Sequence, residues 1–510
     1  MKSFRETQKV FRQHWRIPAV FAALKVLTHL PFLSRYGYHH DELYFLACGQ
    51  HLSFGYVDHP PMIAWIARLA DTLFGQSLVG LRMFSVGAEA AAVFMTGLLV
   101  VRLGGGGFGI FAACFSMLLA ADFVRASIMF TIPSFEPIIW ISCAYLLVRI
   151  IQEKNPRLWI WIGVLIGIGL LIKHSTLFLV FGLGVGMLLT PLRNELKTRW
   201  PYLGGIIALL IFLPNIVWQI VNGWPTIEFL RNLNQGTMRG ISAVQFIAGQ
   251  FLYLSPMTAL ICIAGLVFFF SSRGRPYRVF GWIYGSLFIL LLLIKSKIYY
   301  LAPAYPAVLA AGGVALEHFI ARKQWKNAKS IIVGAMVLSW LIFAPVLLPI
   351  FSIETMDNYC TALTFGSMKN VYEITGDLHG QFGWKERVGI IAKAYDSLSA
   401  QERDSTIIGG TWYGVAGAVD YFGEEYGLPK AVSGHMTYYL WGLPQKPIST
   451  VIVANALTEK WMPNVFDEIT VIGPTTIEHA NPWDRQFAVA ICRKPKVDLH
   501  EIWPKFKNYH

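Results

Sequence analysis

The stretch FIAGQFLYLSPMTALICIAGLVFFF, at residues 246–270, decides the class of this protein. It contains no Asp, Glu, Lys or Arg, and it is long enough to cross a bilayer, whose core takes about 20 mostly apolar residues per helix. A second block, IIALLIFLPNIVWQI at residues 206–220, reaches that length together with its flanks. The sequence therefore predicts an integral membrane protein.

The composition of the whole chain supports this prediction. The chain has 510 residues, of which 55% are hydrophobic and 14% are charged. Average globular chains are about one quarter charged. The net charge of +13 would suggest nucleic-acid binding in a soluble protein, but most Lys and Arg residues lie between the apolar blocks. We therefore interpret them as topology determinants and lipid-headgroup contacts, and expect no nucleic-acid partner.

The remaining apolar blocks predict an α-helical polytopic protein with about 11 transmembrane helices. Two of the spans are short and would form a tilted pair joined by a tight turn at Lys173-His174. The expected spans are residues 17–34, 79–101, 107–121, 126–150, 157–172, 175–191, 201–221, 243–271, 279–294, 298–319 and 329–351.

The distribution of basic residues predicts the orientation of these spans. The first span follows a basic N-terminal segment and has no small-residue cleavage site after it, so we interpret it as a retained helix with a cytoplasmic N-terminus. Most later basic clusters then also fall inside, and residues 35–78 form the first outside loop. An odd number of spans places the tail outside as well. The basic residues of the N-terminal segment are Lys2, Arg5, Lys9, Arg12 and Arg16.

The tail is polar and predicts a separate α/β domain at residues 352–510, after a membrane domain at residues 1–351. Alternating runs at 405–409, 450–454 and 487–492 predict strands, and residues 384–399 predict a helix. Cys360 and Cys492 both fall in this tail. If the tail is extracytoplasmic, a disulfide between them is chemically allowed, and the sequence leaves that question open.

The first outside loop is rich in ionisable residues. It reads YGYHHDELY at residues 36–44 and HLSFGYVDHPPM at residues 51–62, with the carboxylates Asp41, Glu42 and Asp58 among four histidines. Residues 41–52 predict a short helix along the membrane surface. Asp41 could act as a general base, bind a cation or cap this helix. The histidine spacing matches no standard metal motif, so we expect no dedicated metal site, although a divalent metal is an open alternative.

Charged residues at the outer ends of the spans form a second group of candidates. Glu136 begins an apolar helix, where an acidic residue usually faces a cavity. Lys173-His174 lies in one very short outside turn, and the segment from Lys295 through Lys297 to Tyr299 and Tyr300 lies in another. Ammonium groups are natural partners of phosphate. The alternatives are snorkelling of the lysines to ordinary headgroups and interfacial anchoring by the tyrosines.

Several motifs resemble those of the bacterial family 39-type glycosyltransferases of the GT-C superfamily, which include protein mannosyltransferases and lipid A aminoarabinose transferases. The resemblance covers most of the chain. It is carried by DELYF at 41–45, GYVDHPP at 55–61, GLLIKHST at 169–176, LPNIVW at 213–218, NGWPT at 222–226 and KIYYLAPAYP at 297–306.

This resemblance implies a GT-C architecture and transfer of a sugar from a polyprenyl-phosphate donor, with inversion at the anomeric carbon. The acceptor would be lipid A or lipopolysaccharide, another envelope glycan, or a protein, at the extracytoplasmic face of a bacterial inner membrane. Asp41 matches the catalytic acid of the family and would be the general base. Glu42 would support it or hold substrate, and Glu136 falls where relatives carry a second acid.

The same resemblance assigns a set of substrate-binding residues and implies no metal requirement. Fixed cations would stabilise the phosphate that leaves the sugar. The expected substrate-binding residues are Asp58, His59, Lys173, His174, Lys295, Lys297, Tyr299 and Tyr300. Residues 43–45 read Leu-Tyr-Phe, where the aminoarabinose transferases carry a basic residue, so the sugar and the acceptor can differ from theirs.

Two other functions are compatible with these patterns. A proton-coupled carrier also needs charges in the membrane, but carriers usually show internal repeats with charges near the midplane, and this chain shows neither. A glycan polymerase or ligase would share the topology and the lipid donor, and its product would distinguish it.

Overall fold

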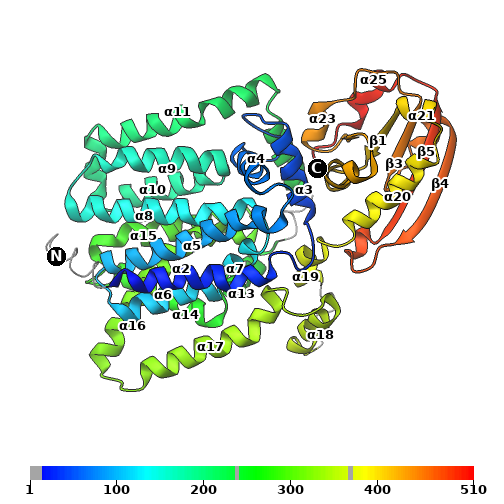
Figure 1. The fold of residues 1–510 in the computed structure, drawn as a ribbon. Coiled ribbons are helices and arrows are strands. Elements are labelled where there is room, and N and C mark those ends of the chain that lie inside the picture. The colour runs from blue at the N-terminus through cyan, green and yellow to red at the C-terminus, as the bar shows by residue number, and fades with distance from the viewer. Residues whose placement is uncertain (1–13, 236–240, 366–371) are drawn as a thin grey trace.

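The computed structural model describes residues 14–235, 241–365 and 372–510 (Figure 1). A bundle of long helices forms one end of the molecule and a small sheet domain forms the other. Lys2, Arg5, Lys9 and Arg12, on which the predicted orientation partly rests, lie outside the described residues.

The bundle contains a helix in each predicted apolar span. Its helices are α2 (Arg16–His29), α5 (Leu78–Arg102), α6 (Gly107–Leu119), α7 (Ala121–Ser127), α8 (Glu136–Glu153), α9 (Leu158–Ile172), α10 (Thr176–Leu188), α11 (Trp200–Val221), α13 (Ala243–Leu254), α14 (Pro256–Phe270), α15 (Arg278–Leu293), α16 (Tyr305–Lys323) and α17 (Ala328–Leu347).

Among the described residues, six helical segments are long and apolar enough to cross a membrane, or up to nine if each bent helix pair counts as one span. This is fewer than the predicted number, because α2 and α9 are too short to be counted and three pairs are bent. The span expected at 243–271 was wrong as a single helix: α13 and α14 meet at 106°. Ser255 there adopts a φ of +66°, and Pro256 has no N–H to continue the helix.

Small residues allow the helices to approach closely. A Cβ added to Gly163 of α9 would lie 2.1 Å from the carbonyl oxygen of Gly204 in α11. A Cβ added to Gly265 of α14 would lie 2.0 Å from the carbonyl oxygen of Val308 in α16. Glycines at such crossings are typical of membrane helices, where van der Waals contact drives association.

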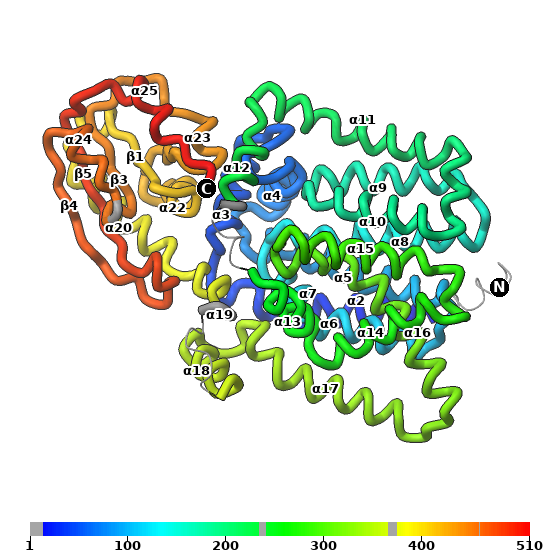
Figure 2. Tube along the Cα trace, turned by 180° about the vertical axis from the view of Figure 1, so that it is seen from behind, coloured from blue at the N-terminus to red at the C-terminus, as the bar shows by residue number. Residues whose placement is uncertain are grey.

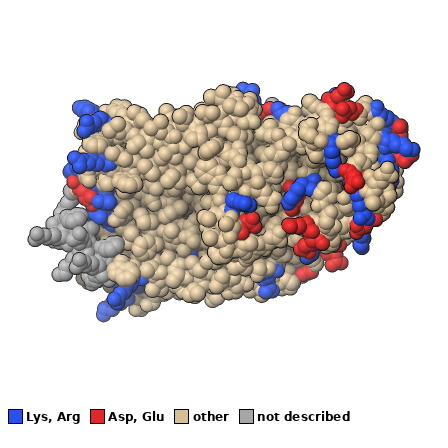
Figure 3. All heavy atoms as spheres, turned by 45° about the horizontal axis from the view of Figure 1, so that its top comes forward, with Lys and Arg blue, Asp and Glu red and all other residues tan. Residues whose placement is uncertain are grey.

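Charged side chains gather at the two ends of the molecule. The view in Figure 3 shows a broad belt almost without Lys, Arg, Asp or Glu, with basic residues near the N-terminal end and a mixture of both signs on the sheet domain. The helices α11 and α17 lie at opposite edges of the bundle, and only 22% of the most apolar stretch of each is buried. The belt is therefore the surface that suits lipid contact.

The sheet domain confirms the strands predicted in the tail. It has five strands, β1 (Thr406–Gly410), β2 (Ala431–Val432), β3 (Thr450–Ala454), β4 (Phe466–Thr476) and β5 (Gln486–Pro495). Their order is β2-β1-β3-β5-β4, with β1 parallel to β2 and β3, and β5 antiparallel to β3 and β4. The helix predicted at 384–399 is α20 (Trp384–Asp396).

The segment between bundle and sheet packs on the bundle. Helix α18 (Ile353–Leu363) shares an apolar cluster with residues of α7 and the end of α17. Cys360 belongs to this cluster, whereas Cys492 belongs to the core of the sheet domain, and both are free thiols. The disulfide that the sequence left open is absent, and the division of the chain at residue 351 stays a prediction.

The segment of residues 35–78, predicted as the first outside loop, lies between the bundle and the sheet domain, as Figures 1 and 2 both show. It forms α3 (His40–Gln50) and α4 (Met62–Phe74). The helix predicted at 41–52 is therefore confirmed, and its position along the membrane surface stays a prediction. Residues 42–49 are buried, because α22 (Tyr413–Phe422) of the sheet domain packs against α3, with Gly417 directly beside the backbone of Leu43.

One buried ion pair fixes α3 in this position. Arg82 of α5 donates from Nε and Nη2 to the two carboxylate oxygens of Glu42, at 2.8 and 2.7 Å, and both side chains are almost completely buried. Arg82 also donates to the carbonyl oxygens of Leu33 and Gly37 and to the side chain of Gln381. A single guanidinium thus joins the bundle, the first outside loop and the segment that leads to the sheet domain.

Replacing Arg82 by Met should lower the free energy of unfolding by about 3–5 kcal/mol, because it leaves the Glu42 carboxylate buried without its partner. The measurement is thermal unfolding of the full-length protein in detergent. Arg68→Met is the matched control, since Arg68 lies 3.7 Å from Asp71 in an exposed pair and its loss should cost about 0.5 kcal/mol or less. Equal stability of the two variants would contradict the anchoring role of Arg82.

Candidate active site

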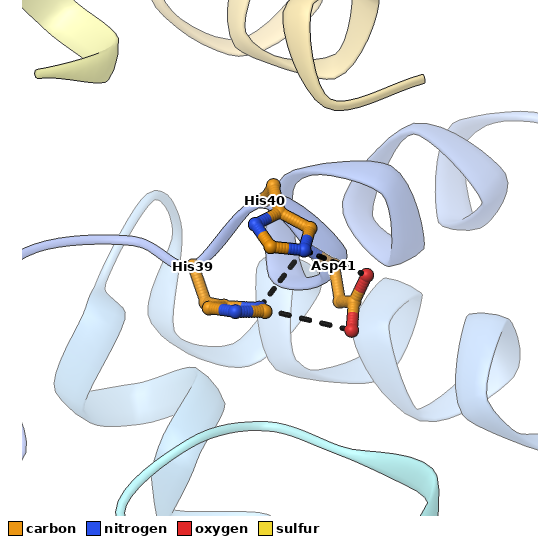
Figure 4. Close-up of side chains that lie close together, drawn as sticks. All are labelled: His39, His40 and Asp41. Atoms are coloured by element: carbon orange, nitrogen blue, oxygen red, sulfur yellow. Dashed lines mark hydrogen bonds and ion pairs between the residues drawn. The ribbon is translucent and has the colours of Figure 1, made fainter. Parts of the chain in front are cut away.

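Asp41 lies in the first turn of α3, beside the rings of His39 and His40 (Figure 4). Its carboxylate oxygens lie 3.7 Å from Nδ1 of His39 and 3.6 Å from Nε2 of His40. About a third of the side chain is exposed, with a relative accessibility of 36%. This is the one acidic side chain of the α3 N-terminus that remains accessible.

Capping of α3 is the task of other residues, so one alternative for Asp41 no longer holds. His39 is the N-cap, and its Nδ1 accepts a hydrogen bond from the backbone N–H of Asp41 at 3.3 Å. The carboxylate of Glu42 accepts from the backbone N–H of His39 at 2.8 Å and from that of Phe130 at 2.6 Å. Together with the two bonds from Arg82, these bonds occupy the acceptor positions of the Glu42 carboxylate. Of the two predicted roles of Glu42, this arrangement favours support of Asp41 over a contact with the substrate.

The sheet domain supplies a partner to Asp41. Tyr413, at the start of α22, donates its hydroxyl to Oδ1 of Asp41 at 2.7 Å. The Tyr413 ring stacks against His435 at a centroid distance of 5.1 Å, and its backbone N–H donates to Nδ1 of that histidine. The phenol is therefore held by its own domain while it contacts the membrane half of the molecule.

The charge state of Asp41 reflects these neighbours. Partial burial by itself raises the pKa of Asp41. The rings of His40 and His39 lower it, and the Tyr413 hydroxyl and the Lys297 ammonium act in the same direction. The resulting pKa lies below the ordinary value of an aspartate, so the group is an ionised carboxylate at neutral pH.

Below Asp41, two of the predicted residues form a buried ion pair. Nζ of Lys173 lies 2.7 Å from Oε2 of Glu136, and the hydroxyl of Ser175 donates to the other oxygen of this carboxylate. The Lys173 ammonium also lies over the rings of Tyr299 and Tyr300, at 4.9 and 4.8 Å from their centroids. The structure therefore brings together four residues that come from three separate turns of the sequence.

The two lysines of the last turn differ in their surroundings. Lys297 is partly buried and its Nζ lies 6.0 Å from the centroid of the Tyr299 ring. Burial and the nearby Lys173 lower its pKa, and Asp41 opposes this shift. Lys295 is exposed, with a φ of +52°. None of the contacts among the described residues joins it to this group, so Lys297 is the better-placed lysine and the substrate role of Lys295 stays a prediction.

The remaining predicted residues lie at the edge of this group. Asp58 accepts a hydrogen bond from the hydroxyl of Tyr44 at 2.7 Å and is partly exposed. His174 contacts Asn215, which in turn donates to the carbonyl oxygen of Phe54 in the first outside loop. Both positions are compatible with a substrate role, which stays a prediction.

His59 does not face the site. Its side chain is 1% exposed and its Nδ1 lies 2.8 Å from the carbonyl oxygen of Pro60. The rings of Phe45 and Tyr56 pack around it, with centroids 5.2 and 4.8 Å away. This burial gives the predicted substrate contact of His59 no support, and that contact stays a prediction.

An apolar cavity opens directly below the Glu136–Lys173 pair. It has a volume of about 40 Å³ and lies between α8, α9, α10, α15 and α16. Its walls begin one helical turn below the polar group: Trp140 follows Glu136 in α8, and Pro303 follows Tyr300. The other lining residues are Cys143, Ala144, Leu147, Ile162, Ile166, Leu179, Leu183, Phe280, Ile283, Tyr284, Ala304, Ala307 and Val308.

The rings of His39 and His40 with the Asp41 carboxylate offer three potential metal-ligand atoms within 4.8 Å of one another. Two imidazoles and a carboxylate would suit zinc. The fit is partial, because Nδ1 of His39 already accepts the backbone N–H of Asp41 and one oxygen of Asp41 takes the Tyr413 hydroxyl. Helix capping accounts for the orientation of His39 without a metal.

Sequence reasoning missed Arg82 and Tyr413. Arg82 is a single basic residue near the start of an apolar span, and Tyr413 lies more than 370 positions from its partner Asp41. The one hint of Arg82 in the sequence is Glu42, an acidic residue within an apolar helix, because a buried carboxylate needs a cationic partner. No local pattern points to Tyr413.

Three comparisons relate the sequence and the fold of this chain to known proteins. The family model "dolichyl-phosphate-mannose-protein mannosyltransferase" matches residues 58–218, which include Asp58, Glu136 and Lys173 but not Asp41. The lipid A galacturonosyltransferase RgtD of Rhizobium johnstonii is 24% identical over 244 residues. That match covers 47% of this chain and 49% of RgtD, so it spans about half the length of the curated relative.

The fold is that of ArnT from Cupriavidus metallidurans. The structure of ArnT bound to undecaprenyl phosphate matches with a TM-score of 0.59 and 13% identity, over 92% of this chain and 97% of ArnT. The apo structure of ArnT matches with a TM-score of 0.62 and 16% identity over the same shares. The chain is therefore similar in part of its sequence to glycosyltransferases that act on proteins or on lipid A, and it shares the fold of ArnT over most of its length.

Proposed function

We propose that this protein is an inverting glycosyltransferase that moves a sugar from a polyprenyl-phosphate donor to an acceptor at the extracytoplasmic face of a bacterial inner membrane. The acceptor is lipid A or another envelope glycan in this proposal, and Asp41 is the general base. The orientation has the N-terminus in the cytoplasm and the sheet domain outside, which agrees with the basic residues at the N-terminal end of the bundle.

The observation that carries the proposal is the position of a charged group directly above an apolar cavity. Lys173, Glu136 and Lys297 lie at or next to the ends of helices. The following turns of these same helices line the cavity. A ligand with a phosphate at one end and a long hydrocarbon chain at the other matches this combination, since the phosphate meets ammonium groups and the chain stays apolar. ArnT, which shares the fold, binds undecaprenyl phosphate, and RgtD acts on lipid A.

The reaction then follows from the geometry. The carboxylate of Asp41 accepts the proton of the acceptor hydroxyl as that oxygen attacks the anomeric carbon. The bond between the anomeric carbon and the phosphate oxygen breaks, and polyprenyl phosphate leaves with both electrons of that bond. Its new negative charge develops next to Lys297 and Lys173. The proton on Asp41 finally passes to solvent through the exposed side of the carboxylate.

Within this scheme Glu136 controls the charge of Lys173. In the present structure its carboxylate neutralises Lys173, whereas within the described residues Lys297 has no carboxylate in ion-pair contact. Lys297 is therefore the cation most available to the donor phosphate. Glu42 acts through Asp41 as a positioning residue, because its own acceptors are taken by Arg82 and by backbone amides.

Asp41→Asn should lower the transfer rate by a factor of about 100 or more, since the amide cannot take up the proton. The measurement uses full-length protein in detergent, a radiolabelled polyprenyl-phosphate sugar from a panel of donors, and an envelope extract as acceptor. Equal melting temperatures of variant and wild type control for folding, and a parallel reaction with EDTA tests the His39-His40-Asp41 group for a metal. Wild-type transfer by Asp41→Asn would rule out Asp41 as the base.

Lys297→Ala should raise the KM for the lipid-linked donor about tenfold, because it removes the phosphate's cation. Lys295→Ala is the matched control from the same turn, and its donor KM should stay unchanged because Lys295 is exposed. The initial rate is measured over a range of donor concentrations at saturating acceptor. Equal donor KM values for the two variants would mean that Lys297 only contacts ordinary lipid headgroups.

Tyr413→Phe should move the acidic limb of the kcat/KM profile to higher pH by about one unit. Activity requires ionised Asp41 and is lost as the pH falls through its pKa. The Tyr413 hydroxyl favours the ionised form, so its removal raises that pKa. Tyr421→Phe removes a hydroxyl of the same helix that bonds Tyr38 and the carbonyl oxygen of Gln76 instead, and its profile should stay in place. An unmoved limb in Tyr413→Phe would show that its hydroxyl does not control Asp41.

A further inference from the structure

Residues 507–510 lie between the bundle and the sheet domain, where Figures 1 and 2 both mark the end of the chain with C. On one side they contact α12 (Pro225–Gln235), the short helix that follows α11 of the bundle. On the other side they contact the turn of the sheet domain that holds His435. We call residues 507–510 together with His435 the terminal link.

Two side-chain contacts join the terminal link to α12. Nδ2 of Asn232 donates to the carbonyl oxygen of Tyr509 at 2.8 Å, and the Tyr509 side chain is buried. Nζ of Lys507 lies 2.6 Å from Oε2 of Glu228. Both partners of this ion pair are exposed, and exposed pairs contribute little. The Asn232 bond is therefore the more specific of the two contacts.

Backbone hydrogen bonds hold the terminal link beside His435. The N–H of Asn508 donates to the carbonyl oxygen of Gly434 at 2.8 Å, and the N–H of Met436 donates to the carbonyl oxygen of Asn508 at 2.9 Å. A Cβ added to Gly434 would lie 2.0 Å from the carbonyl oxygen of Phe506, so glycine is needed for this close approach. The two bonds flank His435 along the chain and fix its backbone.

Both ring nitrogens of His435 have partners. Nδ1 accepts a hydrogen bond from the backbone N–H of Tyr413 at 3.2 Å, so Nδ1 carries no proton. Nε2 then carries the proton and donates it to the carbonyl oxygen of His510 at 2.9 Å. Burial lowers the pKa of His435 below the ordinary value of a histidine, although the bond to His510 and the charge of Asp58 oppose this shift. The ring is therefore neutral and held as one tautomer.

The bond from His435 completes the start of α22. The first N–H groups of a helix have no partner within the helix, and the side chain of the N-cap residue Trp412 makes no capping hydrogen bond. His435 supplies an acceptor for Tyr413 from a neighbouring turn, and the two rings stack with an interplanar angle of 15°. His435 therefore sets both the position and the tilt of the phenol that reaches Asp41 at 2.7 Å.

We propose that the terminal link is a positioning device, which connects α12 to the Tyr413 hydroxyl and holds that hydroxyl on Asp41. This inference rests on the proposed role of Asp41 as the general base. A displacement of α12 would move Tyr509 and His510, and the His435 ring would follow. The phenol would then leave its place at the carboxylate, because hydrogen bonds weaken steeply when they are misaligned. His435 is a positioning residue in this scheme, since it acts through Tyr413.

The first test observes the Tyr413 hydroxyl at neutral pH and requires no transfer assay. Full-length protein labelled with ¹³C at the phenol carbon of tyrosine is studied by NMR in detergent, and the Tyr413 signal is the one absent from Tyr413→Phe. Asp41→Asn gives the reference shift of this phenol without a carboxylate acceptor. His435→Ala should move the signal toward that reference. His435→Asn keeps an acceptor near the place of Nδ1, so its signal should stay close to that of the wild type.

A second variant tests the α12 end of the terminal link. Asn232→Ala removes the bond to Tyr509 at a partly exposed position, so the fold should be retained. Its Tyr413 signal should move in the same direction as in His435→Ala, because the loss of this bond frees the terminal link from α12. Asn222→Ala is the matched control, since Asn222 donates to a carbonyl oxygen of the preceding turn, and the signal should stay in place.

In the transfer assay, His435→Ala should move the acidic limb of the kcat/KM profile to higher pH by about one unit. The cause is the same as in Tyr413→Phe: the carboxylate loses a donor that favours its ionised form. The double variant should move the limb no further, because both changes remove one hydrogen bond. His500→Ala changes an exposed histidine of the same domain that bonds Asp498, and its limb should stay in place.

The outcomes separate the terminal link from the proposed function. Additive shifts in the double variant, or a Tyr413 signal that stays in place in both His435→Ala and Asn232→Ala, would overturn the link even if Asp41→Asn abolishes transfer. If His435→Ala does not fold, equal signals in Asn232→Ala and Asn222→Ala overturn it. A signal that moves as expected, without transfer from any lipid-linked donor, would support the link to Asp41 and reject the transferase.

Discussion

The ion pair between Glu42 and Arg82 is the interaction on which the rest of the site depends. A carboxylate and a guanidinium with almost no exposure must satisfy one another, because an unpaired charge at this depth would cost several kcal/mol. The pair fixes the first turn of α3 to α5, and the carboxylate of Glu42 also caps that turn. These contacts leave the neighbouring Asp41 free of structural duties. Two adjacent acids in one helix turn thereby differ in their surroundings: Glu42 is a buried anchor, and Asp41 is the accessible carboxylate that we propose as the base.

The second constraint is the separation of charge from apolar space along the bundle. Turns between helices place Lys173 and Lys297 at one level, and the same elements continue below as the walls of an apolar cavity. The pair of Lys173 with Glu136 allows these charges to remain close to the hydrocarbon region. A lipid phosphate with its chain fits both levels at once, whereas a soluble nucleotide sugar would leave the cavity without an occupant.

The sheet domain is part of the site rather than an appendage. Helix α22 packs on α3 where Gly417 leaves no side chain between the backbones, and this contact brings Tyr413 to Asp41. The same domain carries Trp412, whose ring lies 5.2 Å from that of His40. The surroundings of Asp41 are thus built by both the bundle and the sheet domain.

The sequence by itself determined the apolar spans, the short basic turns, the strands of the tail and the acid-rich first loop. These are local properties: the period and length of apolar runs and the chemistry of neighbouring residues are set within one element. The tertiary structure alone decided that α13 and α14 bend apart, that Lys297 lies partly buried beside Tyr299 whereas Lys295 is exposed, and that His59 is buried. It also decided that Tyr413 reaches Asp41 and that Arg82 neutralises Glu42. These outcomes depend on which segments, distant in the sequence, pack together. Hydrophobic periodicity and residue spacing describe one element at a time, so they do not predict which side chains meet across a contact between domains.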